Sequence, residues 1–412
     1  MKKIFCIIIA AALFLIPSLF LTSCDGESSG KSVTLYVYNW GEYISDGSED
    51  SLDVNAEFEA YCRDELGINV TVNYSTFSSN EDLYAKLSSG AVKYDVIVPS
   101  DYMVARMIDE GLVQKFSPAE NIENYQYISE DFKNLYYDPE NEYSVPYTYG
   151  TVGIIYNTSM VDEEDIGSWD LMWNEKYSGN ILQFNNPRDA FGTAQFYHGL
   201  SVNSENEDEW REALDLLLEQ KPLVQGYVMD EVFNKMKGGS AAVAPYYAGD
   251  FLTMYEDNED LDFYYPEEGT NVFVDAMCIP TSCQNYDLAV EYINFMLDEE
   301  IAIANAEYIC YASPNSLVYE NEEYIDDMSE MHENVMGILY DFDPSNMEFF
   351  YNLPQDKLML MNDLWEELKI ESNIGTEIYV ICGIIILALV ALLVYNIVKK
   401  KRRQIYFDRY SK

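Results

Sequence analysis

Strand-like and helix-like patterns alternate regularly along the first part of the sequence, and this alternation restricts the fold more than any other feature. Residues 33–38 and 94–99 are apolar runs rich in β-branched and aromatic side chains, while residues 69–74 alternate between apolar and polar. These patterns indicate strands. Residues 50–66 and 78–90 lie between the strands and carry apolar side chains at helical spacing. The alternation predicts an α/β fold with βαβ units on a largely parallel sheet.

A second alternation follows residues 143–157, an extended segment that we expect to leave one lobe and start another. Strands are predicted over 180–184, 241–247 and 271–280, and an amphipathic helix is predicted over 207–220. With 412 residues, the chain is long enough for two domains, because single cores stop growing beyond roughly 250–300 residues. Further helices are predicted over 169–173, 286–297, 299–308 and 358–370. One more helix is predicted to begin at the loop 185–189 and to end at Leu200.

The amino-terminal end has the features of a secretory signal. Residues 1–23 begin with two lysines and continue as an almost wholly apolar run, which predicts a cleaved signal peptide. The four residues ending at Cys24 resemble the lipobox of bacterial lipoproteins, which implies that Cys24 is lipidated and that residues 24–31 form a tether. An uncleaved amino-terminal anchor remains the alternative.

The carboxyl-terminal end contains a second apolar stretch. Residues 374–398 carry one charge, Glu377, and about 20 apolar residues span a bilayer as a helix. The basic segment 399–412 follows directly and, by the positive-inside rule, should lie in the cytoplasm. Both ends therefore predict one topology, in which the main body lies on the extracytoplasmic face of the cell membrane.

The charge of the chain limits its partners. The formal net charge is −48, which disfavours nucleic acid as a partner because phosphate binding needs a basic face. It favours a cationic ligand only weakly, since an acidic composition also serves solubility. With two histidines and no CxxC pair in the chain, a metal site is not expected. Cys278 and Cys283 are close enough in sequence for a disulfide, although buried free thiols are the preferred interpretation.

Candidate binding residues follow the predicted strands. Ligands collect at the carboxyl ends of strands in open α/β sheets, and Trp40, Glu42 and Tyr43 follow the first strand. Asp275 is a charge inside an apolar strand, which is costly unless the residue is paired or functional. Other candidates follow strands or lie at the helix starts beside them, and together with Glu42 they repeat the theme of a carboxylate beside an aromatic residue: Ser100, Tyr102, Asp189, Tyr247 and Asp250.

Four segments in the same order resemble one known family. Residues 38–43, 94–102, 143–147 and 169–173 are similar to motifs of the spermidine/putrescine-binding proteins, the extracytoplasmic receptors of bacterial polyamine ABC importers, and the resemblance extends over residues 33–369. It implies a two-lobed type II periplasmic-binding-protein fold with a ligand cleft between the lobes and a hinge. Lobe 1 would comprise residues 32–146 and 274–313, and lobe 2 would comprise residues 147–273 and 314–371.

The resemblance also implies a set of ligand-binding residues. Aromatic rings would surround the methylene chain of a polyamine, carboxylates would pair with its ammonium groups, Ser100 would add a hydrogen bond, and Tyr311 would contact the ligand near the hinge. The implied rings are Trp40, Tyr43, Tyr102, Tyr247 and Phe273, and the implied carboxylates are Glu42, Asp189, Asp250 and Asp275.

Three positions depart from the family pattern. Tyr247 and Phe273 stand where many members have Trp, and Asn186 stands where spermidine-selective members have Asp. The absence of that carboxylate slightly favours putrescine over spermidine as the ligand.

The resemblance implies a polyamine receptor, for putrescine or spermidine, that delivers its ligand to membrane permease subunits. No enzymatic reaction and no cofactor are expected, because the sequence contains no nucleophile, phosphate-loop or metal motif. Two alternatives remain open at this point. One is a membrane-tethered sensor ectodomain, and the other is a receptor of the same fold for a different small cationic ligand.

Overall fold

The computed structural model describes residues 32–48, 51–341, 344–370 and 399. Within these residues the strands are β1 (Ser32–Trp40), β2 (Asn69–Phe77), β3 (Val96–Ile97), β4 (Ser144–Asn157), β5 (Ile181–Phe184), β6 (Val224–Val228), β7 (Val243–Tyr247), β8 (Leu261–Tyr264), β9 (Thr270–Cys278) and β10 (Met347–Glu348).

The structure contains α-helices and short 3₁₀ helices. The α-helices are α1 (Val54–Asp64), α2 (Asn80–Ser89), α3 (Asp101–Asp109), α4 (Pro118–Asn121), α5 (Pro187–Tyr197), α6 (Glu207–Gln220), α7 (Glu231–Lys237), α8 (Ala248–Asp257), α9 (Tyr286–Met296), α10 (Glu299–Ile309), α11 (Ser316–Tyr319), α12 (Glu322–Met331), α13 (Val335–Leu339) and α14 (Gln355–Ile370). Short 3₁₀ helices are η2 (Glu123–Tyr127), η3 (Glu130–Phe132), η4 (Glu163–Asp165), η5 (Trp169–Trp173), η6 (Glu175–Tyr177) and η7 (Pro344–Asn346).

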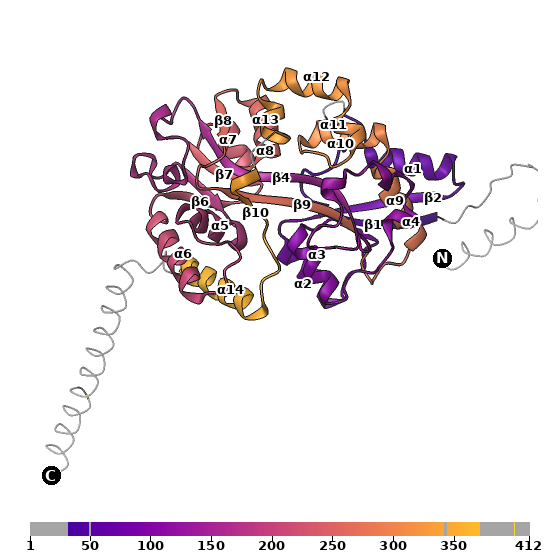
Figure 1. Cartoon of the computed structure of the whole chain (residues 1–412), viewed down its shortest axis with the longest axis horizontal. Helices are drawn as coiled ribbons and strands as arrows, with labels where there is room; N and C mark the ends of the chain where they lie inside the picture. The colour runs from indigo at the N-terminus through magenta and orange to yellow at the C-terminus, as the bar shows by residue number, and fades with distance from the viewer. Residues whose placement is uncertain (1–31, 49–50, 342–343, 371–398, 400–412) are drawn as a thin grey trace, which may run out of the picture.

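Two long strands join the two halves of the molecule. The described strands run in the order β2-β1-β3-β9-β4-β7-β5-β6, with β8 paired to β4 and β10 paired to β9. β1 is parallel to β2 and β3, and β5 is parallel to β6 and β7. β4 and β9 are antiparallel to each other at the centre. Figure 1 shows them running between a half that carries α1 to α3 and a half that carries α5 to α8.

The helices form where the sequence supplies caps and an apolar face. The Asp53 side chain accepts a hydrogen bond from the Ala56 N–H at the start of α1, which then buries Val54, Phe58 and Cys62. Such a cap satisfies one of the backbone N–H groups that have no partner within the helix. In α2, Ser79 plays the same part, and Gly90 ends the helix in the left-handed conformation. These local signals explain why the predicted helices occur close to their predicted positions.

The α/β class is confirmed, and the differences from prediction are local. Residues 248–250, which follow the predicted strand 241–247, begin α8, and α3 directly after β3 was not expected. Residues 169–173 form a 3₁₀ helix. The cysteines of the described chain are free thiols, and of these Cys283 is partly exposed while Cys62, Cys278 and Cys310 are buried.

The predicted ends of the chain fall outside the described residues. This applies to the signal peptide 1–23, the tether 24–31 with Cys24, the span 374–398 and, apart from Lys399, the tail 399–412. Among the residues that are described, none of the helices combines the length and the apolar character needed to cross a bilayer. The lobe boundaries at 146/147 and 273/274 fall inside β4 and β9 and stay predictions.

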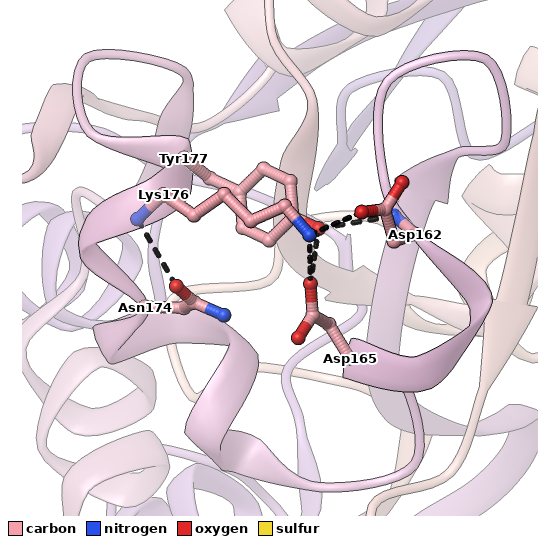
Figure 2. A network of polar contacts seen from close by, with 5 residues as sticks. All are labelled: Asp162, Asp165, Asn174, Lys176 and Tyr177. Carbon is pink, nitrogen blue, oxygen red and sulfur yellow. Dashed lines mark hydrogen bonds and ion pairs between the residues drawn. The ribbon is translucent and has the colours of Figure 1, made fainter.

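An exposed lysine in the second half, Lys176, lies at the centre of a network of polar contacts. Figure 2 shows the Lys176 ammonium between two carboxylates from η4 and the residue before it. It lies 2.7 Å from Asp165 and also pairs with Asp162. The Tyr177 hydroxyl donates to Asp165 at 2.5 Å, and Asn174 accepts from the Lys176 N–H at 3.0 Å. Exposed ion pairs contribute little stability individually, so the network mainly fixes the path of this surface loop.

Candidate functional site

One cleft between the two halves contains every predicted ligand-binding residue. It encloses about 780 Å³ not filled by protein atoms, part of it open to solvent. The predicted residues that line it are Trp40, Glu42, Tyr43, Ser100, Tyr102, Asp189, Tyr247, Asp250, Phe273, Asp275 and Tyr311. Other lining residues are Gly41, Phe77, Ser78, Asn80, Asp101, Asn186, Arg188, Met229, Asp230, Phe233, Tyr246 and Phe350.

The cleft residues come from strand ends and from the first turns of helices. Trp40 ends β1, and Glu42 follows in the left-handed conformation with φ of 51°. Ser100 precedes α3, and Tyr247 precedes α8. Because the ends of neighbouring strands meet at one edge of a sheet, segments far apart in sequence deliver their side chains to the same space. Asp275 instead comes from the central strand β9.

Asp275 is a buried carboxyl group with one oxygen left without a partner. Its side chain is 3% exposed. Its Oδ2 atom accepts a hydrogen bond from the Tyr43 hydroxyl at 2.7 Å, whereas Oδ1 has no hydrogen-bond partner within the described part of the chain. Burial raises the pKa of Asp275 to about 6, and the nearby Ser100 and Tyr43 hydroxyls limit this rise. A buried carboxyl with a free acceptor is a site at which a donor or a cation would be stabilised.

Asp189, at the start of α5, is a second buried carboxyl group. Its Oδ2 atom accepts from the Tyr247 hydroxyl at 3.0 Å and from the Asn186 amide at 2.6 Å. Burial raises the pKa of Asp189 to about 7, and the charge of Glu81 adds to the rise. Asn186 also caps α5 through the Arg188 N–H, so this residue orients Asp189 and begins the helix that carries it.

Asp250, in the first turn of α8, is a third carboxyl group whose charged form is unfavourable. Burial, with smaller contributions from the carboxylates of Asp230 and Glu42, raises the pKa of Asp250 to about 8. A cation placed among these groups would stabilise their charged forms. The cleft is therefore built to hold positive charge.

Aromatic rings line the space between the carboxyl groups. The Tyr43 and Tyr311 rings pack edge to face with centroids 4.9 Å apart, and Tyr247 packs in the same way on Phe273 at 5.4 Å. Such pairs hold rings in fixed orientations. The arrangement provides apolar faces for CH₂ groups and π-faces for cations.

Of the lining residues that were not predicted from the sequence, Arg188 and Phe350 are in direct contact with each other. Arg188 is 2% exposed, and its Nη2 atom donates to the Asn203 side chain at 2.9 Å and to the Tyr351 carbonyl at 3.2 Å. The Phe350 ring lies 4.6 Å from the Arg188 guanidinium. Arg188 is adjacent to the predicted Asp189, which was a usable signal. Phe350 lies in an unpatterned segment, and no local signal marks it.

Comparison with known proteins assigns the family. Residues 55–331 match the model of the bacterial extracellular solute-binding protein family. The spermidine/putrescine-binding periplasmic protein of Escherichia coli is 33% identical over 285 residues, which cover 68% of this chain and 78% of that protein. The putrescine-binding periplasmic protein PotF of Escherichia coli is 28% identical over 309 residues, covering 70% of this chain and 80% of that protein.

A solved structure agrees with these sequence relatives. The spermidine/putrescine ABC transporter substrate-binding protein PotD of Streptococcus pneumoniae superimposes with a TM-score of 0.64 at 33% identity, covering 82% of this chain and 98% of that one. The family consists of solute-binding proteins of ABC transporters and not of enzymes. The chain therefore belongs to the bacterial extracellular solute-binding proteins, and within them to the spermidine/putrescine-binding proteins.

Proposed function

We propose that this protein is an extracytoplasmic polyamine receptor that binds putrescine or spermidine and delivers it to an ABC importer. The observation that carries the proposal is the combination, in one cleft, of three carboxyl groups with raised pKa values and a lining of aromatic rings. The carboxyl groups are Asp189, Asp250 and Asp275. The names of the relatives point to the same class of ligand.

The chemistry of a polyamine matches this cleft. A polyamine is a flexible apolar chain with ammonium groups, so its receptor must desolvate CH₂ groups while giving each ammonium group a carboxylate. Buried charges are tolerable only in such pairs, and cation–π contact adds roughly 0.5–2 kcal/mol. In the proposal Asp189, Asp250, Asp275 and the more exposed Glu42 pair with ammonium groups, and Ser100 adds a hydrogen bond. The methylene chain lies against Trp40, Tyr43, Tyr102, Tyr247, Phe273 and Tyr311.

The residue at position 186 bears on which polyamine is preferred. Asn186 donates its amide to Asp189 and adds no negative charge to the cleft. A third ammonium group would therefore find one carboxylate fewer than in the spermidine-selective members. For this reason putrescine is the proposed preferred ligand.

Delivery to the permease would use closure of the two halves on the ligand. Among the described elements, β4 and β9 run between the halves, so a hinge is proposed in these strands, with lobe 1 as residues 32–146 and 274–313 and lobe 2 as residues 147–273 and 314–371. Hinge closure around a ligand is the common motion of such receptors. The closed form would present both halves together to the permease.

The proposed location is the extracytoplasmic face of the cell membrane. It rests on the predicted signal peptide 1–23, on Cys24 as a lipidation site and on the predicted span 374–398 followed by a cytoplasmic tail. The names of the relatives, which are periplasmic proteins, support the extracytoplasmic part.

Isothermal titration of the full-length chain with putrescine and spermidine tests the proposal. We expect micromolar or tighter binding that Asp275→Asn weakens by at least tenfold, because a charged pair in a buried site is lost. Asp326→Asn is the matched control, since Asp326 is an exposed acid on α12. A folded, ligand-stripped protein that binds neither polyamine would overturn the proposal and favour the sensor alternative.

A further inference from the structure

A register shift in β4 brings Thr148 opposite the carboxyl group at the centre of the cleft. The pairing of β4 with β9 shifts between Pro146 and Thr148, and beyond the shift Thr148 is the direct partner of Asp275. Directly opposed residues of a sheet present their side chains on the same face. β-bulges redirect side chains in this way and are frequent near functional sites. Thr148 is 3% exposed.

Both residues at the shift hold Tyr43. The Tyr147 hydroxyl donates to the Tyr43 carbonyl at 3.0 Å, and the Thr148 hydroxyl lies 2.6 Å from the Tyr43 hydroxyl. The Tyr43 hydroxyl in turn donates to Asp275 Oδ2 at 2.7 Å. All three bonds are buried, and they join the loop after β1 to the two strands that run between the halves.

The chemistry of Thr148, Tyr43 and Asp275 determines which group donates in each of the two hydrogen bonds that link them. An ionised carboxylate only accepts hydrogen bonds, and a tyrosine hydroxyl has a single hydrogen to donate. When Tyr43 donates to Asp275, it can only accept from Thr148, so the Thr148 hydroxyl must be the donor of the first bond. We propose that Thr148 is a positioning residue of the ligand site, whose hydroxyl orients the Tyr43 hydroxyl as a donor to Asp275.

The Thr148 hydroxyl should also stabilise the ionised form of Asp275. Donation to Tyr43 polarises its hydroxyl and strengthens the bond that it makes to Asp275, because linked hydrogen bonds reinforce one another. Without the Thr148 hydroxyl, the ionised form of Asp275 loses part of its stabilisation. The effect on Asp275 does not depend on the identity of the ligand, whereas the effect on affinity rests on the proposed polyamine function.

Other charged or titratable groups also face Asp275. A variant that tests Thr148 must leave these groups unchanged. Asp101 from α3, Asp189 from α5 and Tyr147 from β4 interact with its charge, in addition to Tyr43. A substitution at Thr148 changes none of these groups. A change in the titration of Asp275 would then report the loss of the hydroxyl.

The first test follows the Asp275 carboxyl directly in the full-length, ligand-free chain. Aspartate labelled with ¹³C at the carboxyl carbon is titrated by NMR, with Asp275→Asn identifying the signal. Thr148→Val keeps the shape but removes the hydroxyl, and we expect it to raise the midpoint by about half to one pH unit. Thr148→Ser should restore the original midpoint.

An unchanged midpoint in the valine variant, or a serine variant that behaves like valine, would overturn the proposal. If valine is not accommodated, Thr148→Ala removes the same hydroxyl and takes its place in the comparison with serine.

Titration of the same variants with putrescine is the second test. Thr148→Val should weaken binding about three- to tenfold at pH 6 and less at pH 9, where Asp275 is ionised in either protein. Equal weakening at both pH values would indicate a packing role and contradict the proposal. If the unaltered chain binds no polyamine, the proposed function fails, while the NMR result still decides the role of Thr148.

Discussion

The acidic residues of the cleft differ in how strongly the protein opposes their charge. Asp275 accepts a hydrogen bond from the Tyr43 hydroxyl and lies close to the Ser100 hydroxyl, whereas Asp189 accepts from a tyrosine hydroxyl and an amide. Neither is paired directly with a cation of the described chain at ion-pair distance. Desolvation raises the pKa of a carboxyl group, and the charge of the neighbouring Arg188 offsets this rise only in part at Asp189. A cationic ligand would remove this cost, so the residues proposed to bind it are also those most sensitive to pH.

Affinity for a polyamine should therefore rise with pH. The pKa values of the ligand-free groups are about 6 for Asp275, about 7 for Asp189 and about 8 for Asp250. An ammonium ligand needs the ionised forms, so binding releases protons and is opposed below these values. We expect the dissociation constant to fall at least about tenfold between pH 5.5 and pH 8.5 and then to level off.

Isothermal titration in buffers of different ionisation enthalpy measures both the affinity and the protons released. In Asp275→Asn, the part of the profile near pH 6 should disappear. A dissociation constant that does not change over this range would show that the carboxyl groups are already ionised without ligand.

At the scale of the element, β4 pairs with three other strands, which its sequence alone does not indicate. All of its residues are buried, and it pairs with β9 at its start and with β7 and β8 at its end. Gly153 lies where β8 crosses closely: a Cβ atom there would come within 2.2 Å of the Phe263 ring and 2.8 Å of the Tyr264 carbonyl. The absence of a side chain at this position allows β8 to pair with β4.

Gly153→Ala should destabilise the protein through this contact. Overpacking of a close-packed interior typically costs about 1–3 kcal/mol, and here the Tyr264 carbonyl belongs to the backbone and cannot rotate away. The free energy of unfolding from urea denaturation measures the effect. Gly226→Ala in β6 is the matched control, since a Cβ atom there meets nothing within 4 Å. Equal stability of the two variants would mean that β8 moves without cost.

At the scale of the whole molecule, the two halves already lie close together around the cleft. Tyr43 and Asp275 are 5% and 3% exposed, and the segment around Phe350 contacts both halves: Tyr136 donates to its carbonyl at 2.5 Å, and Arg188 binds the neighbouring Tyr351 carbonyl. Because Asp275 is so little exposed, we expect a ligand to reach it only when the halves separate. The ligand-free protein in solution should therefore sample a more open arrangement.

Small-angle X-ray scattering tests this expectation. Saturating putrescine should reduce the radius of gyration of the full-length chain and bring the scattering closer to the profile calculated from this structure, because binding favours the closed form. Asp275→Asn at the same ligand concentration should show a smaller reduction. Identical profiles with and without ligand would argue against hinge closure.

The sequence alone determined the features that depend on local patterns. The alternation of strands and helices predicted the α/β class, because periodicity and capping act over a few residues. The predicted helix over 207–220 has the bounds observed for α6. The predicted cleft residues follow strands, start helices or match ordered motifs, and the structure brings all of them into one cleft.

Only the tertiary structure decided which distant segments complete and tune that cleft. Phe350 enters it from an unpatterned segment, and the Arg188 guanidinium lies beneath its ring. Thr148 faces Asp275 only because the register of β4 shifts beside it. A one-residue shift changes which face of a sheet a side chain occupies, and such a shift depends on packing between residues more than a hundred positions apart, which no local pattern records.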